Sequence, residues 1–428
     1  MLKRIFATFS LIALSVTGFA PAANAAVAEP AFDAVNASAL WDRGFTGEGS
    51  SIAFIDQGVN LSHEYFQGEV IDGFCLYSPS TPNLCPNGTK SQTGIPAASQ
   101  RIVNGFPELS ENHGNMVAGI AAGKPNSVAP GGIAPGAKIV MANIDFTTLE
   151  AITAAAQYIL DRADVNNTVA LSLSFGGFFS EREFPREWLQ CDTNPSLSAL
   201  ASVFKQLRDK GIITFASAGN TPTLDIATSI FPSCLKEVVA VGSVNPQNQV
   251  SWYVTMSQKI ELLAPDYAQT ADTIGYQQGS GTSAAAPLTA GAFALLRQAF
   301  PTISSETILS TMKATGNKVD DILRKQIPMV NLATSYSQLA SGVVTPPAAG
   351  QKVTIGTFQG YIAIYTQGYE GRRLTAKVAG KWLAVDPITL VPGKTYSLVK
   401  RNTGAGYLVS VEVFIDGQRV ASQQVLTR

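Results

Sequence analysis

Residues 138–175 read KIVMANIDFTTLEAITAAAQYILDRADVNNTVALSLSF. Two short apolar runs, Lys138 to Ile144 and Val169 to Phe175, flank an Ala-rich run from Thr148 to Ala163. The β-branched runs predict strands, and the run between them predicts a crossover helix. Because both runs are apolar almost throughout, we expect these strands to be buried on both faces of a parallel sheet.

The same alternation extends outward over about residues 34 to 335. It predicts further strands at Ser51 to Asp56, Ile212 to Ala218 and Val238 to Val244, and helices at Ser196 to Lys210 and Ser283 to Ala299. The fold class is therefore α/β, with an open, doubly wound parallel sheet that binds ligands beyond the carboxyl ends of its strands. A dinucleotide-binding enzyme has the same pattern, but no G-x-G-x-x-G follows the first strand.

The composition changes after Leu339. Residues 340–350, ASGVVTPPAAG, are rich in Pro, Gly and Ala and predict a linker between a main domain at 26–339 and a second domain. Residues 351–428 contain short apolar runs separated by turns at Ala379-Gly380, Pro392-Gly393 and Asp416-Gly417. We expect a small antiparallel β domain here, a sandwich or a barrel.

Charge is unevenly distributed between these parts. The whole chain has a formal net charge of -1, which gives no reason to expect nucleic-acid binding. Residues 351–428 contain ten Lys or Arg against four acidic residues. This basic domain predicts attachment to an anionic surface or polymer, or it is an ordinary solvated β-domain surface.

The N-terminal segment from Met1 to Ala25 is typical of a signal peptide. It has a basic start, an apolar stretch and the small-residue pattern Ala23-Asn24-Ala25, which predicts cleavage before Ala26. A single-span anchor is the alternative, but the apolar stretch is short and interrupted by polar residues. We therefore expect a secreted protein, in the periplasm, on the surface or in the medium, without a transmembrane segment after signal removal.

Four cysteines fit an oxidising compartment. Cys75 and Cys85 flank a Pro-, Asn- and Ser-rich stretch, which favours their pairing and leaves Cys191 with Cys234. Sequence alone allows three connectivities. A zinc site is disfavoured because the chain has no C-x-x-C pair and only two histidines.

The chain contains the parts of a serine hydrolase. His113 stands where a polar loop enters a small-residue helix, whereas His63 lies in a loop segment and is expected to be structural. Ser283 follows glycines and starts an Ala- and Leu-rich helix, whose first amides favour negative charge nearby. An imidazole, a hydroxyl and an orienting carboxylate such as Asp56 are what nucleophilic catalysis by serine requires.

Six segments together resemble those of the subtilisin-like serine proteases, or subtilases. The segments are Ile55-Asp-Gln-Gly58, His113-Gly-Asn-Met-Val-Ala-Gly119, Gly132-Ile-Ala-Pro-Gly-Ala137, Ser172-Leu-Ser-Phe-Gly176, Ala216-Ser-Ala-Gly-Asn220 and Gly281-Thr-Ser-Ala-Ala-Ala-Pro287. The order Asp, His, Ser is also that of subtilisin. The resemblance covers about residues 34–335. Lipases and esterases place the serine first, in a G-x-S-x-G turn that is missing here.

The resemblance implies specific roles. Asp56 would orient His113, His113 would activate Ser283, and Asn220 would donate to the oxyanion, in a secreted endopeptidase acting on extended polypeptides. The implied substrate-binding residues are Ser174, Phe175, Gly176, Ala218, Gly219 and Ile230. Ile230 stands where relatives have a pocket-base glycine, so we expect a preference for small side chains at P1, the residue before the cleaved bond. The chemistry requires no metal or cofactor, and structural calcium stays unassigned because no dense acidic loop is visible.

Three departures from the family pattern bear on activity. Gln57 follows the aspartate, Asn115 follows His113-Gly114, and Ala284 follows the serine, where relatives usually have other residues. None removes a reacting atom. They leave open an alternative from another class, a catalytically weak or inactive subtilase fold used for binding or surface attachment.

Overall fold

The protein is described here from a computed structural model that covers residues 27–103, 106–109, 111–144, 148–177, 191–222, 230–255, 257, 259–321 and 326–341, together with the strands named below between 352 and 426. The chain divides into two compact units, Met1–Leu339 and Ala340–Arg428. The expected signal peptide and most of the expected linker lie outside the described residues.

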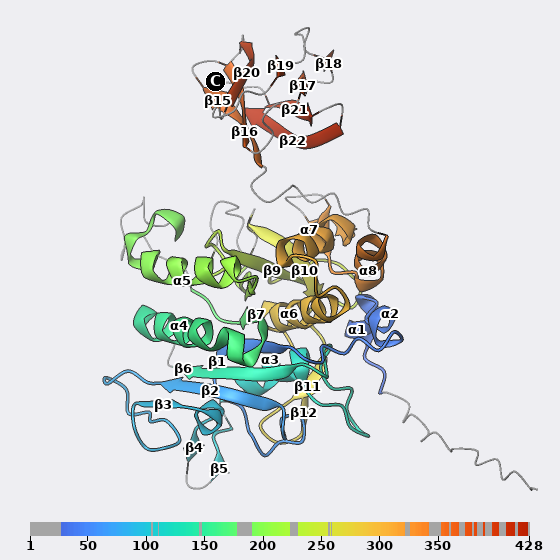
Figure 1. Ribbon diagram of the computed structural model, residues 1–428. Coiled ribbons are helices and arrows are strands. Elements are labelled where there is room, and N and C mark those ends of the chain that lie inside the picture. Colours follow the sequence, from blue (N-terminus) through green and yellow to red (C-terminus); the bar gives the residue numbers. More distant parts are fainter. Residues whose placement is uncertain are drawn as a thin grey trace, which may run out of the picture. The chain divides into compact units, whose positions relative to one another are not determined.

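Ten of the described strands form one sheet in the first unit (Figure 1). Their order is β13 (Asn317–Val319), β14 (Ile327–Met329), β10 (Ile260–Pro265), β9 (Val238–Val244), β8 (Ile213–Ser217), β7 (Thr168–Leu173), β1 (Ser51–Asp56), β6 (Lys138–Ile144), β2 (Val70–Leu76) and β3 (Ser91–Thr93). The edge strands β13 and β3 pair antiparallel with their neighbours, and the strands between them run parallel. The predicted parallel α/β sheet is confirmed.

Helices pack in pairs against this sheet. Helix α4 (Leu149–Asn166) contacts α5 (Ser198–Asp209), and α3 (His113–Ala122) contacts α6 (Thr282–Ala299). Ala53 and Ile55 of β1 belong to the apolar cluster of α4 and α5. Because side chains alternate along a strand, Asp56 projects from the opposite face of β1, and α3 and α6 both contact that strand. The carboxylate thus projects from the face opposite the α4 and α5 cluster.

Shorter elements complete the first unit. They are α1 (Pro30–Ala34), α2 (Ser38–Trp41), α7 (Ser305–Thr315), α8 (Leu332–Ala340), η1 (Ile95–Ala98), η3 (Cys191–Thr193), η4 (Pro195–Leu197), and the pairs β4 (Ile102–Val103) with β5 (Phe106–Pro107) and β11 (Gln269–Ala271) with β12 (Tyr276–Gln278). No described helix has both the length and the apolar character required to cross a lipid bilayer.

Two predicted strands end earlier than expected. Strand β7 stops at Leu173 and β8 at Ser217, so Ser174, Phe175 and Ala218 lie in the loops that follow. The carbonyl of Ser174 accepts a hydrogen bond from the Ser283 hydroxyl. The first residues beyond β7 therefore contact the start of helix α6.

The described strands of the second unit pair antiparallel, as predicted. One sheet has the order β15 (Lys352–Phe358), β16 (Tyr361–Gln367), β20 (Tyr396–Arg401), and the other has β18 (Lys381–Trp382), β17 (Arg373–Val378), β21 (Leu408–Ile415), β22 (Gln418–Leu426), with β19 (Ile388–Thr389) on β17. Ile364 of the first sheet and Val411 and Val413 of the second are buried. The three predicted turn pairs lie outside the described residues, although Ile415 pairs with Gln418 across the last of them.

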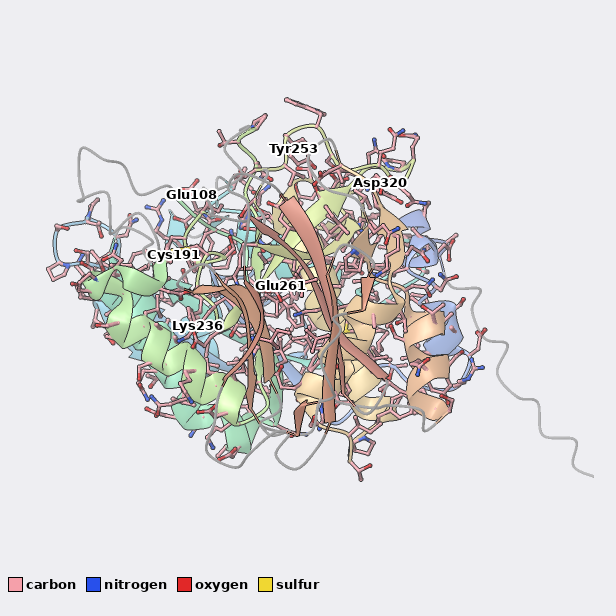
Figure 2. All side chains as sticks on the ribbon, turned by 90° about the horizontal axis from the view of Figure 1, so that it is seen from above. Glu108, Cys191, Lys236, Tyr253, Glu261 and Asp320 are labelled. Atoms are coloured by element: carbon pink, nitrogen blue, oxygen red, sulfur yellow. A yellow bond between two sulfur atoms is a disulfide. The ribbon has the colours of Figure 1, made fainter. Side chains whose placement is uncertain are left out.

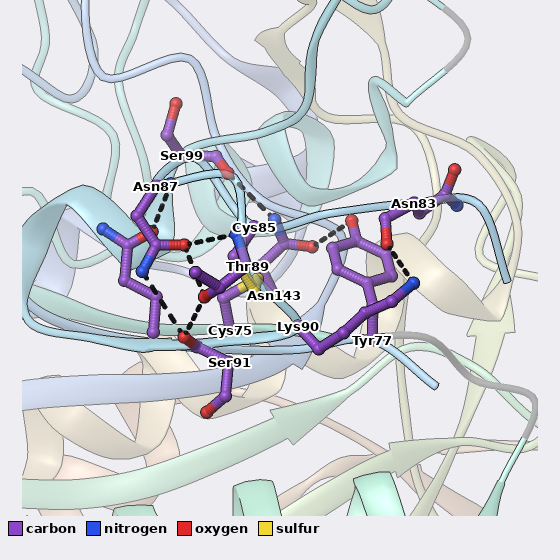
Figure 3. Close-up of a disulfide and its surroundings, with 11 residues drawn as sticks. Cys75, Tyr77, Asn83, Cys85, Asn87, Thr89, Lys90, Ser91, Ser99 and Asn143 are labelled. Carbon is purple, nitrogen blue, oxygen red and sulfur yellow. Dashed lines mark hydrogen bonds between the residues drawn. A yellow bond between two sulfur atoms is a disulfide. The ribbon is translucent and has the colours of Figure 1, made fainter. Parts of the chain in front are cut away.

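Both cysteine pairs favoured by the sequence form disulfides. The Cα atoms are 5.9 Å apart in Cys75–Cys85 and 5.7 Å apart in Cys191–Cys234. Figure 3 shows the first pair, which joins β2 to the loop after it. Lys90 Nζ donates to the carbonyls of Thr81 and Asn83 within that loop. The disulfide joins this polar loop to β2, and Lys90 connects two backbone carbonyls within it.

Candidate active site

Asp56 is the last residue of β1, and its side chain is only 1% exposed. Its Oδ1 accepts hydrogen bonds from Nδ1 of His113 at 2.8 Å and from the backbone N–H of Gln57 at 2.7 Å. Its Oδ2 is buried without a hydrogen-bond partner among the described residues. The imidazole is therefore a principal partner for the buried carboxylate charge.

His113 is the first residue of helix α3 and is half-buried. The negative charge of Asp56 raises the pKa of the imidazole above its ordinary value, against the opposing effect of burial. With Nδ1 donating to Asp56, the neutral ring has its other nitrogen, Nε2, available as a proton acceptor. This is the tautomer that a general base beside a serine requires.

Gln57 supports the start of helix α3 from the neighbouring loop. The helix N-cap Asn112 makes no side-chain capping bond, and Gln57 Oε1 instead accepts the His113 N–H at 3.1 Å. A Cβ at Gly114 would lie 2.1 Å from the Gln57 carbonyl oxygen, so only glycine allows this close approach. The departure at Gln57 therefore supplies a helix cap rather than disturbing the site.

The other two departures are also accommodated. Asn115 is fully buried, accepts the Asn60 N–H at 2.7 Å and donates to Gln100 Oε1 at 2.8 Å. Ala284 is buried in the first turn of α6. Asn115 therefore has its side-chain amide hydrogen-bonded, and the small Ala284 side chain is buried without any polar group to satisfy.

Ser283 is the second residue of helix α6 and is partly exposed. Its hydroxyl donates to the Ser174 carbonyl at 3.1 Å, and the Ser174 hydroxyl donates to the Ser283 carbonyl at 2.9 Å. This reciprocal pair ties the start of α6 to the loop after β7. The hydroxyl thus points at Ser174 in this structure rather than at the imidazole.

Asn220 follows β8 and is oriented by Thr282. Its Oδ1 accepts from both the backbone N–H and the hydroxyl of Thr282, at 2.9 and 2.8 Å. The Thr282 hydroxyl oxygen in turn accepts the Gly219 N–H at 3.0 Å. With its oxygen occupied, Asn220 has its donor group Nδ2 left for other contacts.

One cavity of about 510 Å³ brings most of the candidate residues together. It is lined by Gln57, His113, Ser174, Phe175, Gly176, Gly177, Ser217, Gly219, Asn220, Thr221, Ile230, Thr255, Thr282 and Ser283. Asp56 lies buried behind His113. Ala218 differs from expectation because it is buried in an apolar cluster with Val254 and Leu263.

Ile230 closes one part of this cavity. A Cβ added to Gly219 would lie 2.5 Å from Ile230 Cδ1, and one added to Gly176 would lie 2.8 Å from the same atom. The Ile230 side chain therefore contacts both glycine backbones of the expected specificity pocket. Little room is left there for a large side chain.

Sequence reasoning missed Thr282 and Thr255. Thr255 Oγ1 donates to the Thr221 carbonyl at 2.9 Å and accepts the Thr221 N–H at 3.2 Å, which fixes the loop after Asn220. Thr282 lies inside the segment that contains Ser283, so its position next to the proposed nucleophile could have indicated a role in the site. Thr255 stands 35 residues after Asn220 in the chain and belongs to no recognised motif.

His63 lies away from this cavity, as expected for a structural residue. Its Nε2 pairs with the Gly275 carbonyl at 2.8 Å, and its Nδ1 accepts the Tyr65 N–H at 3.1 Å. Within the described residues, no three His, Cys, Asp or Glu side chains gather as a metal site would require.

The comparisons with known proteins all point to one protein family. The sequence model of the subtilase family matches residues 47–332. The chain is 25% identical to Subtilisin NAT of Bacillus subtilis subsp. natto over 290 residues, which is 66% of this chain and 64% of that protein. It is 24% identical to the Major intracellular serine protease of Bacillus subtilis (strain 168), covering 61% of this chain and 73% of that protein. The chain thus spans about 64% of the length of the first relatives it matches.

Solved structures agree in fold. Proteases from Pseudoalteromonas arctica PAMC 21717 superpose with a TM-score of 0.55 at 22% identity, covering 71% of this chain and 93% of that one. A cold adapted subtilisin-like serine proteinase gives a TM-score of 0.50 at 22% identity, covering 67% and 90%. At these identities the likeness concerns the fold alone.

Proposed function

The chain belongs to the subtilase family, and from this premise we propose that it is a serine endopeptidase that cleaves extended polypeptides. The observation that carries the proposal is the 2.8 Å hydrogen bond between buried Asp56 and His113, at a cavity that Ser283 and Asn220 also line. These four residues come from distant parts of the chain, which makes a purely structural reason for their arrangement weak.

The reaction would proceed through an acyl-enzyme. The Ser283 hydroxyl turns from Ser174 toward the imidazole, His113 Nε2 takes its proton, and Oγ attacks the peptide carbonyl carbon. The oxyanion receives hydrogen bonds from Asn220 Nδ2 and the Ser283 backbone N–H. The C–N bond then breaks as His113 protonates the leaving amine. Water, deprotonated by His113, attacks the acyl carbon, the ester C–O bond breaks, and His113 returns the proton to Ser283 Oγ.

Substrate binding would use the loop after β7. Ser174, Phe175 and Gly176 line the cavity directly after β7, where their backbone groups could pair with a peptide backbone. Gly177 and Phe231 are joined by two backbone hydrogen bonds, which hold this segment beside Ile230. Backbone pairing supplies affinity with little side-chain selectivity, and Ile230 restricts P1 to small residues.

Hydrolysis of an unfolded protein by wild type and by Ser283→Ala tests the proposal. We expect release of peptides from reduced, carboxymethylated casein by wild type and a loss of at least about 10³-fold in the variant. The matched control is Ser310→Ala, a helix serine of α7 whose hydroxyl donates to the Thr307 carbonyl one turn earlier and does not line the cavity. Equal rates for wild type and Ser283→Ala would refute the proposal.

A binding protein with an inactive subtilase fold is the second candidate. The observation that favours it is the Ser283 hydroxyl, which donates to Ser174 rather than to His113. In this case wild type would bind unfolded casein without cleaving it.

We also propose that the protein is secreted. Two disulfides fit an oxidising compartment, and residues 1–25 have the composition of a signal peptide. N-terminal sequencing of protein collected outside the cytoplasm should begin at Ala26. Accumulation of the full-length chain in the cytoplasm would contradict this.

A further inference from the structure

Tyr253 and the buried carboxylate of Asp266 form a chain of hydrogen bonds that ends at Gly281, in the turn before Ser283. Gly281 is the N-cap of helix α6 with φ +77, and its N–H donates to Tyr253 Oη at 3.2 Å. The Tyr253 hydroxyl donates its own proton to Asp266 Oδ2. Because that proton is directed at a carboxylate, the phenol oxygen presents a lone pair to Gly281. Tyr253 is labelled in the upper part of Figure 2.

Asp266 is held rigidly. It follows β10 directly, is 8% exposed, and its backbone N–H donates to the carbonyl of Val244 at the end of β9. The Ser251 hydroxyl donates to the same Oδ2. Burial, with the bond to Asp266 as a further cause, raises the pKa of Tyr253, which keeps its hydroxyl protonated near neutral pH. The acceptor offered to Gly281 is therefore anchored on two core strands.

The turn at Gly281 is next to both the proposed oxyanion donor, Asn220, and the proposed nucleophile, Ser283. A Cβ at Gly281 would lie 2.7 Å from Asn220 Nδ2. The next residue, Thr282, makes the two hydrogen bonds that orient Asn220, and Ser283 follows it. A displacement of this turn would move the nucleophile and the oxyanion donor together. Errors of about 1 Å in such geometry can cost about 10² in rate.

We propose that Tyr253, held by Asp266, is a positioning residue that fixes the Gly281 turn and so aligns Ser283 with Asn220. This rests on the proposed protease function. Tyr253 and Asp266 act through the Gly281 N–H and belong to none of the recognised motifs.

Tyr253→Phe keeps the ring and removes only the acceptor. We expect kcat on a short peptide substrate to fall on the order of tenfold, the effect of losing one hydrogen bond. KM should change less than about twofold, because the groups that line the binding cavity are untouched. Asp266→Asn should lower kcat in the same direction, and the double variant should lose less than the product of the two single effects, since both act on one N–H.

Tyr65→Phe is the matched control. Tyr65 Oη also accepts a glycine backbone N–H, that of Gly131 at 2.8 Å, at a place that does not line the cavity. The control should lose comparable stability and keep wild-type kcat.

If Tyr253→Phe has the kcat of wild type, or if both tyrosine variants lose kcat equally, the positioning role is wrong. In either case the difference between wild type and Ser283→Ala still reports on the protease function separately. If Tyr253→Phe does not fold, Asp266→Asn decides by the same kcat comparison.

Discussion

Asn220 is oriented so that its amide nitrogen, rather than its oxygen, is left for the proposed contact with the oxyanion. Thr282 occupies the oxygen with two hydrogen bonds. We predict that Asn220→Ala lowers kcat by about 10² to 10³ with little change in KM, because the donor acts on the oxyanion formed in the transition state. Steady-state kinetics on a peptide substrate measures this. Full turnover in the variant would show that Asn220 has another role.

His113 sets the pH dependence of the proposed reaction. Only the neutral imidazole can accept the Ser283 proton, and Asp56 raises the His113 pKa above the ordinary value of 6.5. Activity should therefore be present at high pH and fall as the pH drops through a midpoint above 6.5. The pH profile of kcat/KM checks this. Asp56→Asn should move the midpoint downward, and an unchanged midpoint would contradict the coupling.

Ile230 should determine which side chains fit before the cleaved bond. It contacts the backbones of Gly176 and Gly219, so wild type should prefer small P1 residues. Ile230→Gly should gain activity toward P1 Phe and Leu, measured with a peptide library. Ile274→Gly is the control, since Ile274 is 73% exposed and does not line the cavity. A wild-type profile dominated by large aromatic P1 residues would contradict the assignment.

At the level of elements, the two disulfides close chain segments of different length. Their sequence separations are 10 and 43 residues. Loop-closure entropy predicts stabilisation of about 2.7 kcal/mol for Cys75–Cys85 and about 4 kcal/mol for Cys191–Cys234. Denaturant unfolding of the two paired Cys→Ser variants measures the difference. A larger loss for the Cys75 and Cys85 pair would contradict the entropic account.

The elements that sequence reasoning located best are those with uninterrupted apolar patterns. Strands β1, β6 and β9 have the predicted limits, because each is buried throughout or nearly so. Helix α4 begins after Thr148, whose hydroxyl caps it, but runs to Asn166, three residues beyond the prediction. Its last turn is more polar, so periodicity gave no signal there.

The positions of the candidate site residues along the chain could be proposed from motifs, but the contacts that support them could not be predicted. Motifs identified Asp56, His113, Ser283 and Asn220, and the rule that ligands bind at carboxyl ends of parallel strands predicted the cavity's place. Tyr253, in the loop between β9 and β10, bonds Gly281 and is held by Asp266, and this depends on the packing of β9 and β10 against helix α6. No local pattern encodes such a contact between residues far apart in sequence.

At the scale of the whole molecule, the proposed catalytic residues all belong to the first compact unit, Met1–Leu339. We predict that a chain ending at residue 341 keeps kcat/KM within about twofold of the full chain, since every described cavity residue remains. Kinetics of the purified truncated protein checks this. A loss of folding or activity would mean that the β domain is required.

The β domain itself is predicted to bind an anionic polymer. Its excess of basic residues should retain the full chain, but not the truncated chain, on heparin resin at low salt, with release as salt rises. Equal elution of both chains would favour a plain solvated surface.

Covalent labelling tests the central claim most directly, because it requires the acid, the base and the hydroxyl to act together. A fluorophosphonate should label wild type, and peptide mapping should locate the adduct at Ser283, with labelling lost in Ser283→Ala and strongly slowed in His113→Ala. A wild-type protein that is folded yet takes up no label, or takes it up equally without His113, would contradict the catalytic triad.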